Sequence, residues 1–91
     1  MVQSYFNKIA TLLSASAWVE SVLLMRYDLL DIEEERVLIY RIRADLFDGG
    51  LLEISERLVS SVVGGAITIT MYRFHWQDRN GVLVKRWDNA P

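Results

Sequence analysis

The sequence predicts an α+β fold in which an N-terminal helix packs on a roughly five-stranded antiparallel meander sheet. Apolar residues near the N-terminus recur at helical spacing, and the rest of the chain consists of runs rich in β-branched and aromatic residues. The turns between these runs are too short for the crossover that parallel strands need, so successive strands are expected to be antiparallel neighbours. Residues 1–91 are expected to form a single α+β domain.

The helix is predicted at the start of the chain. Four apolar residues recur there at spacings of four, three and four positions: Val2, Phe6, Ile9 and Leu13. This spacing places them on one face of a helix. The opposite face carries little positive charge, which favours packing on a sheet over binding to a membrane surface. Small residues at 14–17 are expected to end the helix.

Two strands are predicted on either side of an acidic segment. The first, at 18–30, is rich in valine, leucine and aromatic residues, and the second, at 36–47, alternates in character. One face of the second strand carries Leu38, Tyr40, Ile42, Ala44 and Leu46, and the other carries Arg41, Arg43 and Asp45. The acidic segment is interpreted as a solvated loop containing Asp28, Asp31, Glu33, Glu34 and Glu35.

Three further strands are predicted at 51–59, 66–77 and 82–87. The turns between them are marked by Asp48-Gly49-Gly50, by Gly64-Gly65 and by Asp78-Arg79-Asn80-Gly81. Glycine suits such turns because it accepts a positive φ without steric cost.

The register of the C-terminal hairpin depends on its turn, and two alternatives are open. A two-residue turn at 80–81 places His75 opposite Arg86. A type I turn followed by a left-handed Gly81 shifts the pairing by one residue and places His75 near Lys85. The aspartate at the first turn position and the glycine at the fourth favour the second alternative.

The amino-acid composition excludes several kinds of site and several classes of protein. The absence of cysteine excludes disulfides and thiolate metal sites, and a single histidine gives no metal-ligand spacing, so no metal and no cofactor is expected. No apolar run approaches the roughly 20 residues of a membrane span, and the N-terminus does not resemble a signal peptide. We therefore expect a cytoplasmic protein with no membrane association. The hydrophobic fraction of 52% leaves apolar surface for a partner, which favours a homodimer or a heteromeric complex.

The C-terminal hairpin is the candidate functional element, because it holds His75, the only histidine in the chain. A histidine acid or base with arginines beside it suits RNA cleavage without a metal: a base deprotonates the 2′-hydroxyl, and cations stabilise the charge that grows on the phosphate. Glu53 or Glu56 is a candidate for the second proton-transfer group. Aromatic residues of the hairpin are candidates for stacking on bases: Tyr72, Phe74, Trp76 and Trp87. The structural alternative is a packed histidine among ordinary cross-strand ion pairs.

Five segments, in order along nearly the whole chain, resemble the TumE-like family, the toxin half of bacterial toxin–antitoxin pairs. They are Trp18-Val19-Glu20-Ser21, Arg26-Tyr27, LLEISE at 51–56, HWQDRNG at 75–81 and RWDNAP at 86–91. The last two are the most specific. The resemblance also implies that a histidine-bearing tail follows Asn-Ala-Pro, outside the 91 residues. A functional site that includes this tail and one that lacks it are both compatible with the sequence.

The resemblance implies a small cytoplasmic growth inhibitor that pairs with a helix-turn-helix antitoxin and acts on RNA. The family's motif residues correspond here to Glu53, Glu56, His75, Arg86 and Asp88, which are the predicted catalytic residues. Further cationic and aromatic residues are predicted to bind RNA or a partner protein: Arg41, Arg43, Arg73, Trp76, Lys85 and Trp87. The alternative is a binding module without catalysis, which docks on a partner through an uncovered face of the sheet.

Overall fold

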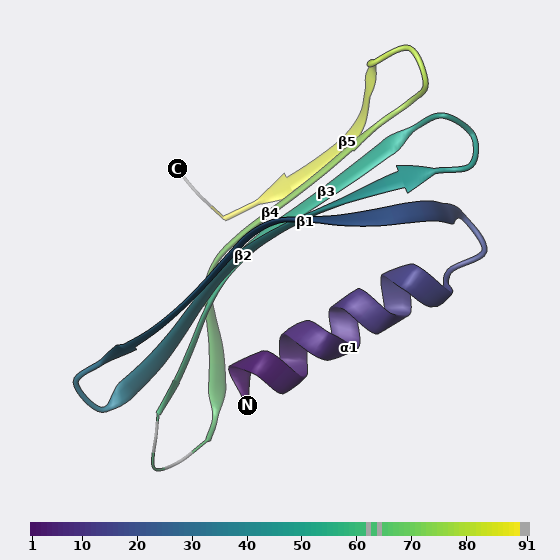
Figure 1. The fold of residues 1–91 in the computed structure, drawn as a ribbon. Helices are drawn as coiled ribbons and strands as arrows, with labels where there is room; N and C mark the ends of the chain where they lie inside the picture. Colours follow the sequence, from purple (N-terminus) through teal and green to yellow (C-terminus); the bar gives the residue numbers. More distant parts are fainter. Residues whose placement is uncertain (62, 64, 90–91) are drawn as a thin grey trace.

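The computed structural model describes residues 1–61, 63 and 65–89. One helix is followed by strands in the order α1 (Val2–Ala15), β1 (Val19–Ile32), β2 (Glu35–Leu46), β3 (Leu51–Ser61), β4 (Ile67–Gln77) and β5 (Leu83–Asp88). The strands form one antiparallel sheet in the order β1-β2-β3-β4-β5, and α1 lies along one face of it (Figure 1). The predicted α+β fold and meander are confirmed. The Gly64 half of the predicted Gly64-Gly65 turn lies outside the described residues, and Gly65 has a φ of 75°.

Helix α1 packs its apolar stripe on β1, β2 and β3. Val2 is fully buried, and the Phe6 ring lies between two tyrosine rings, with centroids 4.9 Å from Tyr27 and 5.0 Å from Tyr40. Both ring pairs meet edge to face, the arrangement that aromatic quadrupoles favour. The periodicity of the sequence therefore identified the covered face of the helix correctly.

The core lies between α1 and one face of β2 and β3. The side chains of Leu38, Tyr40, Ile42 and Ala44 are at most 1% exposed, as the alternation of this strand predicts. Directly opposite them on β3 are Leu58, Glu56, Ile54 and Leu52. The side chains between them therefore point to the face that α1 leaves uncovered.

The prediction of a solvated acidic loop was wrong. Strand β1 continues to Ile32 and β2 begins at Glu35, so only Glu33 and Glu34 remain for the turn. Asp28 and Asp31 lie within β1. Arginines neutralise these two carboxylates, with Arg26 Nε 2.6 Å from Asp28 Oδ2 and Arg36 Nε 2.8 Å from Asp31 Oδ1. Cation pairing and the apolar residues interleaved with the acids outweigh their preference for a loop.

The hairpin between β4 and β5 has the turn of one predicted alternative and the strand register of the other. Its turn is the favoured one: the Gly81 N–H donates to the Asp78 carbonyl at 3.0 Å, and Gly81 has a φ of 78°. The register that this turn was expected to impose is wrong, because His75 lies opposite Arg86. Gln77 pairs with 83 and Trp76 with 85, so residue 84 is a second bulge that restores the other register.

Adding a methyl group at Gly50 is expected to destabilise the fold. A Cβ there lies 2.8 Å from the Gln77 backbone oxygen, which belongs to a paired strand and cannot move freely. We expect Gly50→Ala to lower the free energy of unfolding by about 1–3 kcal/mol, measured by urea denaturation. Gly81→Ala is the comparison. Its new Cβ has no non-adjacent neighbour nearer than 4.0 Å, so the only expected cost is backbone strain from the positive φ. A Gly50→Ala protein as stable as the unmodified chain would contradict this expectation.

Candidate functional site

Two rows of side chains cross the sheet on the face away from α1. Antiparallel register places them directly opposite one another on neighbouring strands, with Cβ atoms about 4.5–5.5 Å apart. The first row consists of Arg43, Glu53, His75 and Arg86. The second row consists of Arg41, Ser55, Arg73 and Asp88. Residues from β2, β3, β4 and β5 that are far apart in the sequence therefore meet on one face.

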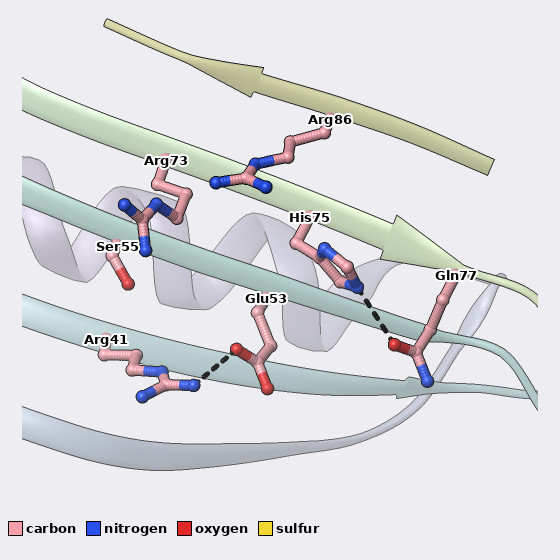
Figure 2. A pocket seen from close by; sticks show the side chains of 7 residues that line it. All are labelled: Arg41, Glu53, Ser55, Arg73, His75, Gln77 and Arg86. Atoms are coloured by element: carbon pink, nitrogen blue, oxygen red, sulfur yellow. Dashed lines mark hydrogen bonds and ion pairs between the residues drawn. The ribbon is translucent and has the colours of Figure 1, made fainter. Parts of the chain in front are cut away.

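An open hollow of about 300 Å³ lies over these rows (Figure 2). Its lining residues are Arg41, Glu53, Ser55, Arg73, His75, Gln77 and Arg86. Figure 2 shows the helix behind the sheet and these side chains in front of it. Of the predicted catalytic residues, Glu53, His75 and Arg86 are thus brought together, along with Arg41 and Arg73 from the predicted binding set.

The hollow is rich in positive charge. Three guanidinium groups line it, and only one carboxylate does, that of Glu53. Arg41 Nη2 donates to Glu53 Oε2 at 2.6 Å, and Arg86 Nε donates to Asp88 Oδ2 at 3.0 Å. Among the residues that the structure describes, no carboxylate forms an ion pair with Arg73. Its guanidinium is therefore free to bind an anion such as a phosphate.

His75 is half-buried in the middle of the hollow. Its Nε2 atom is 2.9 Å from Oε1 of Gln77, two residues further along β4. Gln77 was not among the predicted site residues. The signal that identifies it is the strand period, because residues i and i+2 share a face of a strand. The first row places Glu53 directly across from His75 on one side and Arg86 on the other.

The structure does not bring Glu56 into the hollow. Its side chain points to the opposite face of the sheet and is 2% exposed, beneath α1. The Tyr40 hydroxyl donates to Glu56 Oε1, and the Tyr5 hydroxyl donates to the same carboxylate at 3.3 Å. Burial, the hydrogen bond to Glu56 and the nearby negative charge raise the pKa of the Tyr40 phenol above its usual range. Burial and the same carboxylate raise the pKa of Tyr5.

These raised pKa values predict alkaline sensitivity. Tyrosine in the unfolded chain ionises near pH 10, whereas folded Tyr40 keeps its proton to higher pH. Stability is therefore fully present below about pH 10 and decreases as the pH rises above it, by up to about 1.4 kcal/mol per pH unit for one group. Tyr40→Phe is expected to reduce this slope and leave the part due to Tyr5. Urea unfolding at a series of pH values measures it, and an unchanged slope in the variant would contradict the assignment.

The aromatic residues of the hairpin also lie away from the hollow. Strand alternation turns Tyr72, Phe74 and Trp76 to the face that carries α1, and Trp87 pairs with Phe74 there. The Lys85 ammonium lies 4.8 Å from the centroid of the Trp87 ring. Trp76 and Trp87 remain 37% and 40% exposed. The predicted stacking surface and the predicted acid–base pair are therefore on opposite faces of the sheet.

Two predicted site residues belong to the cross-strand rows but do not line the hollow. Arg43 belongs to the first row, but it pairs with Asp45 at 3.2 Å and does not line the hollow. Asp88 ends the second row and holds the Arg86 guanidinium. Within the described segments, no three histidine, aspartate or glutamate side chains are grouped so as to bind a metal. In the same residues we find no helix with the length and apolarity needed to span a bilayer.

The arrangement has the parts needed for proton transfer next to a bound anion. Glu53 and His75, two side chains in the hollow whose chemistry allows proton transfer, lie directly opposite each other. The guanidinium groups of Arg73 and Arg86 lie beside them, where they can neutralise charge on a phosphate.

Comparison with known proteins supports the resemblance seen in the sequence. A family described as "Toxin TumE" matches residues 9–91. No curated protein and no solved structure matches the chain. The matched range includes every strand and all the residues that line the hollow. The chain therefore belongs to the TumE family of toxins.

Proposed function

We propose that this toxin inhibits growth by cleaving RNA without a metal, in the hollow over β2–β5. The observation that carries the proposal is the first cross-strand row, which places Glu53 opposite His75 and His75 opposite Arg86. A pair of proton-transfer groups flanked by guanidinium groups is what cleavage at a ribose 2′-hydroxyl requires.

In this proposal Glu53 and His75 act as the acid–base pair. One of them takes the proton from the 2′-hydroxyl as its oxygen attacks the phosphorus. The other gives a proton to the 5′-oxygen as the P–O bond breaks, leaving a 2′,3′-cyclic phosphate and a free 5′-hydroxyl. Arg73 and Arg86 bind the phosphate oxygens, whose negative charge grows in the transition state. Arg41 holds the Glu53 carboxylate and Asp88 holds Arg86.

A protein partner is the second part of the proposal. Large apolar side chains are exposed along both edges of the sheet, among them Leu23, Leu24 and Leu30 of β1 and Leu83 and Trp87 of β5. Such surfaces are typical of interfaces. We propose that the partner is a helix-turn-helix antitoxin. The toxin by itself is proposed to be a homodimer. Its proposed location is the cytoplasm, where RNA and antitoxin meet. Size-exclusion chromatography with light scattering measures the oligomeric state.

A toxin that acts only by binding is the second candidate function. The exposed aromatic residues Trp76 and Trp87 favour it, because tryptophan often anchors interfaces. The two candidates differ in their requirements. RNA cleavage depends on the hollow, whereas sequestration of a partner depends on the aromatic surface on the opposite face. Variants of His75 and of Trp87 therefore separate them.

The proposed function is tested with purified protein and a single-stranded RNA in the presence of EDTA. We expect cleavage that leaves 2′,3′-cyclic phosphate ends, and we expect no cleavage of the same sequence with 2′-O-methyl groups throughout, because that strand has no 2′-hydroxyl to attack. Intact RNA in both reactions, together with a partner protein that co-purifies at fixed stoichiometry, would support the binding function. Cleavage of the 2′-O-methyl strand would contradict the proposed chemistry.

A further inference from the structure

The hydrogen bond between His75 and Gln77 distinguishes the two nitrogens of the only imidazole in the chain. Nε2 lies 2.9 Å from Oε1 of Gln77, and Figure 2 shows the two side chains turned toward each other. A carboxamide oxygen accepts hydrogen bonds and cannot donate them. With the carboxamide oxygen facing the ring, this hydrogen bond forms when Nε2 carries the hydrogen of the neutral ring, which leaves the lone pair on Nδ1.

We propose that Gln77 is a positioning residue: it fixes the tautomer and orientation of His75 so that Nδ1 exchanges the proton with the substrate. The proposal rests on the proposed RNA cleavage for its catalytic meaning, although the tautomer itself does not. A hydrogen bond at one ring nitrogen commonly determines which nitrogen is available for chemistry.

The surroundings of the ring support this assignment. Three other polar groups face His75 from neighbouring positions: Glu53 on β3, Arg86 on β5 and Arg73 on the same strand. Glu53 is engaged with Arg41 at 2.6 Å, and Arg86 is engaged with Asp88 at 3.0 Å. Within the described part of the chain, Gln77 supplies the hydrogen bond to the imidazole.

Gln77 is also well placed to hold a fixed orientation. It lies at the end of β4 between two paired strands, opposite Leu51 on β3 and Leu83 on β5. The bulge at residue 84 allows this pairing while keeping His75 opposite Arg86. The side chain is half-buried, which limits competition from water. The bulge thus allows His75, Arg86 and the Gln77 amide to lie together in the hollow.

The tautomer is measured by ¹⁵N–¹H NMR of protein labelled at histidine, where a single residue gives the whole spectrum. At a pH where the ring is neutral, we expect the proton on Nε2 in the unmodified chain. Gln77→Glu keeps an acceptor and is expected to keep this tautomer. Gln77→Lys offers only donors and is expected to move the proton to Nδ1 in the larger share of molecules. An Nδ1 proton in the unmodified chain, or the same tautomer in all three proteins, would overturn the proposal.

The rate of RNA cleavage is the second readout. Gln77→Lys is expected to lower the rate about 10²-fold because the proton sits on the wrong nitrogen, and Gln77→Glu is expected to lower it less, because the correct tautomer is kept. Circular dichroism of both variants verifies the fold. If the unmodified chain does not cleave RNA, the proposed function fails while the NMR result still decides the role of Gln77. If the tautomer shifts and cleavage does not change, Gln77 orients the ring without any part in the reaction, and the proposal is wrong.

Discussion

Replacing His75 with alanine is expected to lower the rate of RNA cleavage by about 10²–10⁴-fold, the usual contribution of a positioned acid or base. The side chain lies on the uncovered face of the sheet and not in the core beneath α1, so the fold is expected to survive the change. Circular dichroism and urea unfolding verify this. Arg86→Ala is expected to have a similar effect, because it removes a guanidinium group from beside the reacting phosphate.

Arg57→Ala is the matched control for these variants. Arg57 lies on the same strand face as Glu53 and Ser55, but it donates to the Thr70 hydroxyl at 2.9 Å and does not line the hollow. Its loss removes one positive charge from the same face without touching the proposed site. We expect its rate to stay close to that of the unmodified chain. Equal losses in the Arg57 and His75 variants would mean that general charge, and not the hollow, determines activity.

The second large effect is expected in the core, at the contact between Tyr40 and Glu56. Glu56→Met leaves the buried Tyr40 hydroxyl without its acceptor, and Tyr40→Phe removes a hydrogen bond from a carboxylate that is 2% exposed. Each change is expected to lower the free energy of unfolding by about 1–3 kcal/mol. The double variant is expected to lose less than the sum, because removing both polar partners leaves fewer unpaired groups. Urea denaturation of all four proteins measures this coupling.

Glu56→Met, compared with Glu53→Gln, also tests the role of Glu56. If it belongs to the core, folded Glu56→Met retains RNA cleavage, whereas Glu53→Gln loses it. Losses that add without coupling would contradict the hydrogen bond between Tyr40 and Glu56. Loss of cleavage in a Glu56→Met protein that remains folded would return Glu56 to the catalytic set that the family motif suggests.

Much of the fold could be predicted because it follows from local periodicity. The spacing of apolar residues identified α1 and its covered face, and alternation in β2 identified the buried row from Leu38 to Ala44. The acidic segment was misread because charge suggested a loop. Asp31 is paired with Arg36 of the neighbouring strand, and that contact depends on the register, which the sequence does not show; Asp28 is paired with Arg26 of its own strand.

The site was predicted less completely because it depends on the relative alignment of four strands. Sequence patterns could show that Glu53 and Glu56 point to opposite faces, but not the register with β2 that places Glu56 on the face that α1 covers. Covering one face buries Glu56 and leaves Glu53 beside His75. The bulge at residue 84 has no signature as clear as a glycine turn, so the less favoured of the two predicted registers is the one observed. Gln77 was not predicted because its hydrogen bond to the ring cannot be read from the sequence, although the strand period places it on the same face as His75.

The most direct test of the central claim is the growth of a bacterial host after induced expression of the 91-residue chain, of His75→Ala and of Arg57→Ala. If the hollow is the active site, the unmodified chain and Arg57→Ala arrest growth, and His75→Ala does not, with all three proteins present at equal levels. Arrest by His75→Ala as strong as that by the unmodified chain would contradict the claim and direct attention to the aromatic face of the sheet.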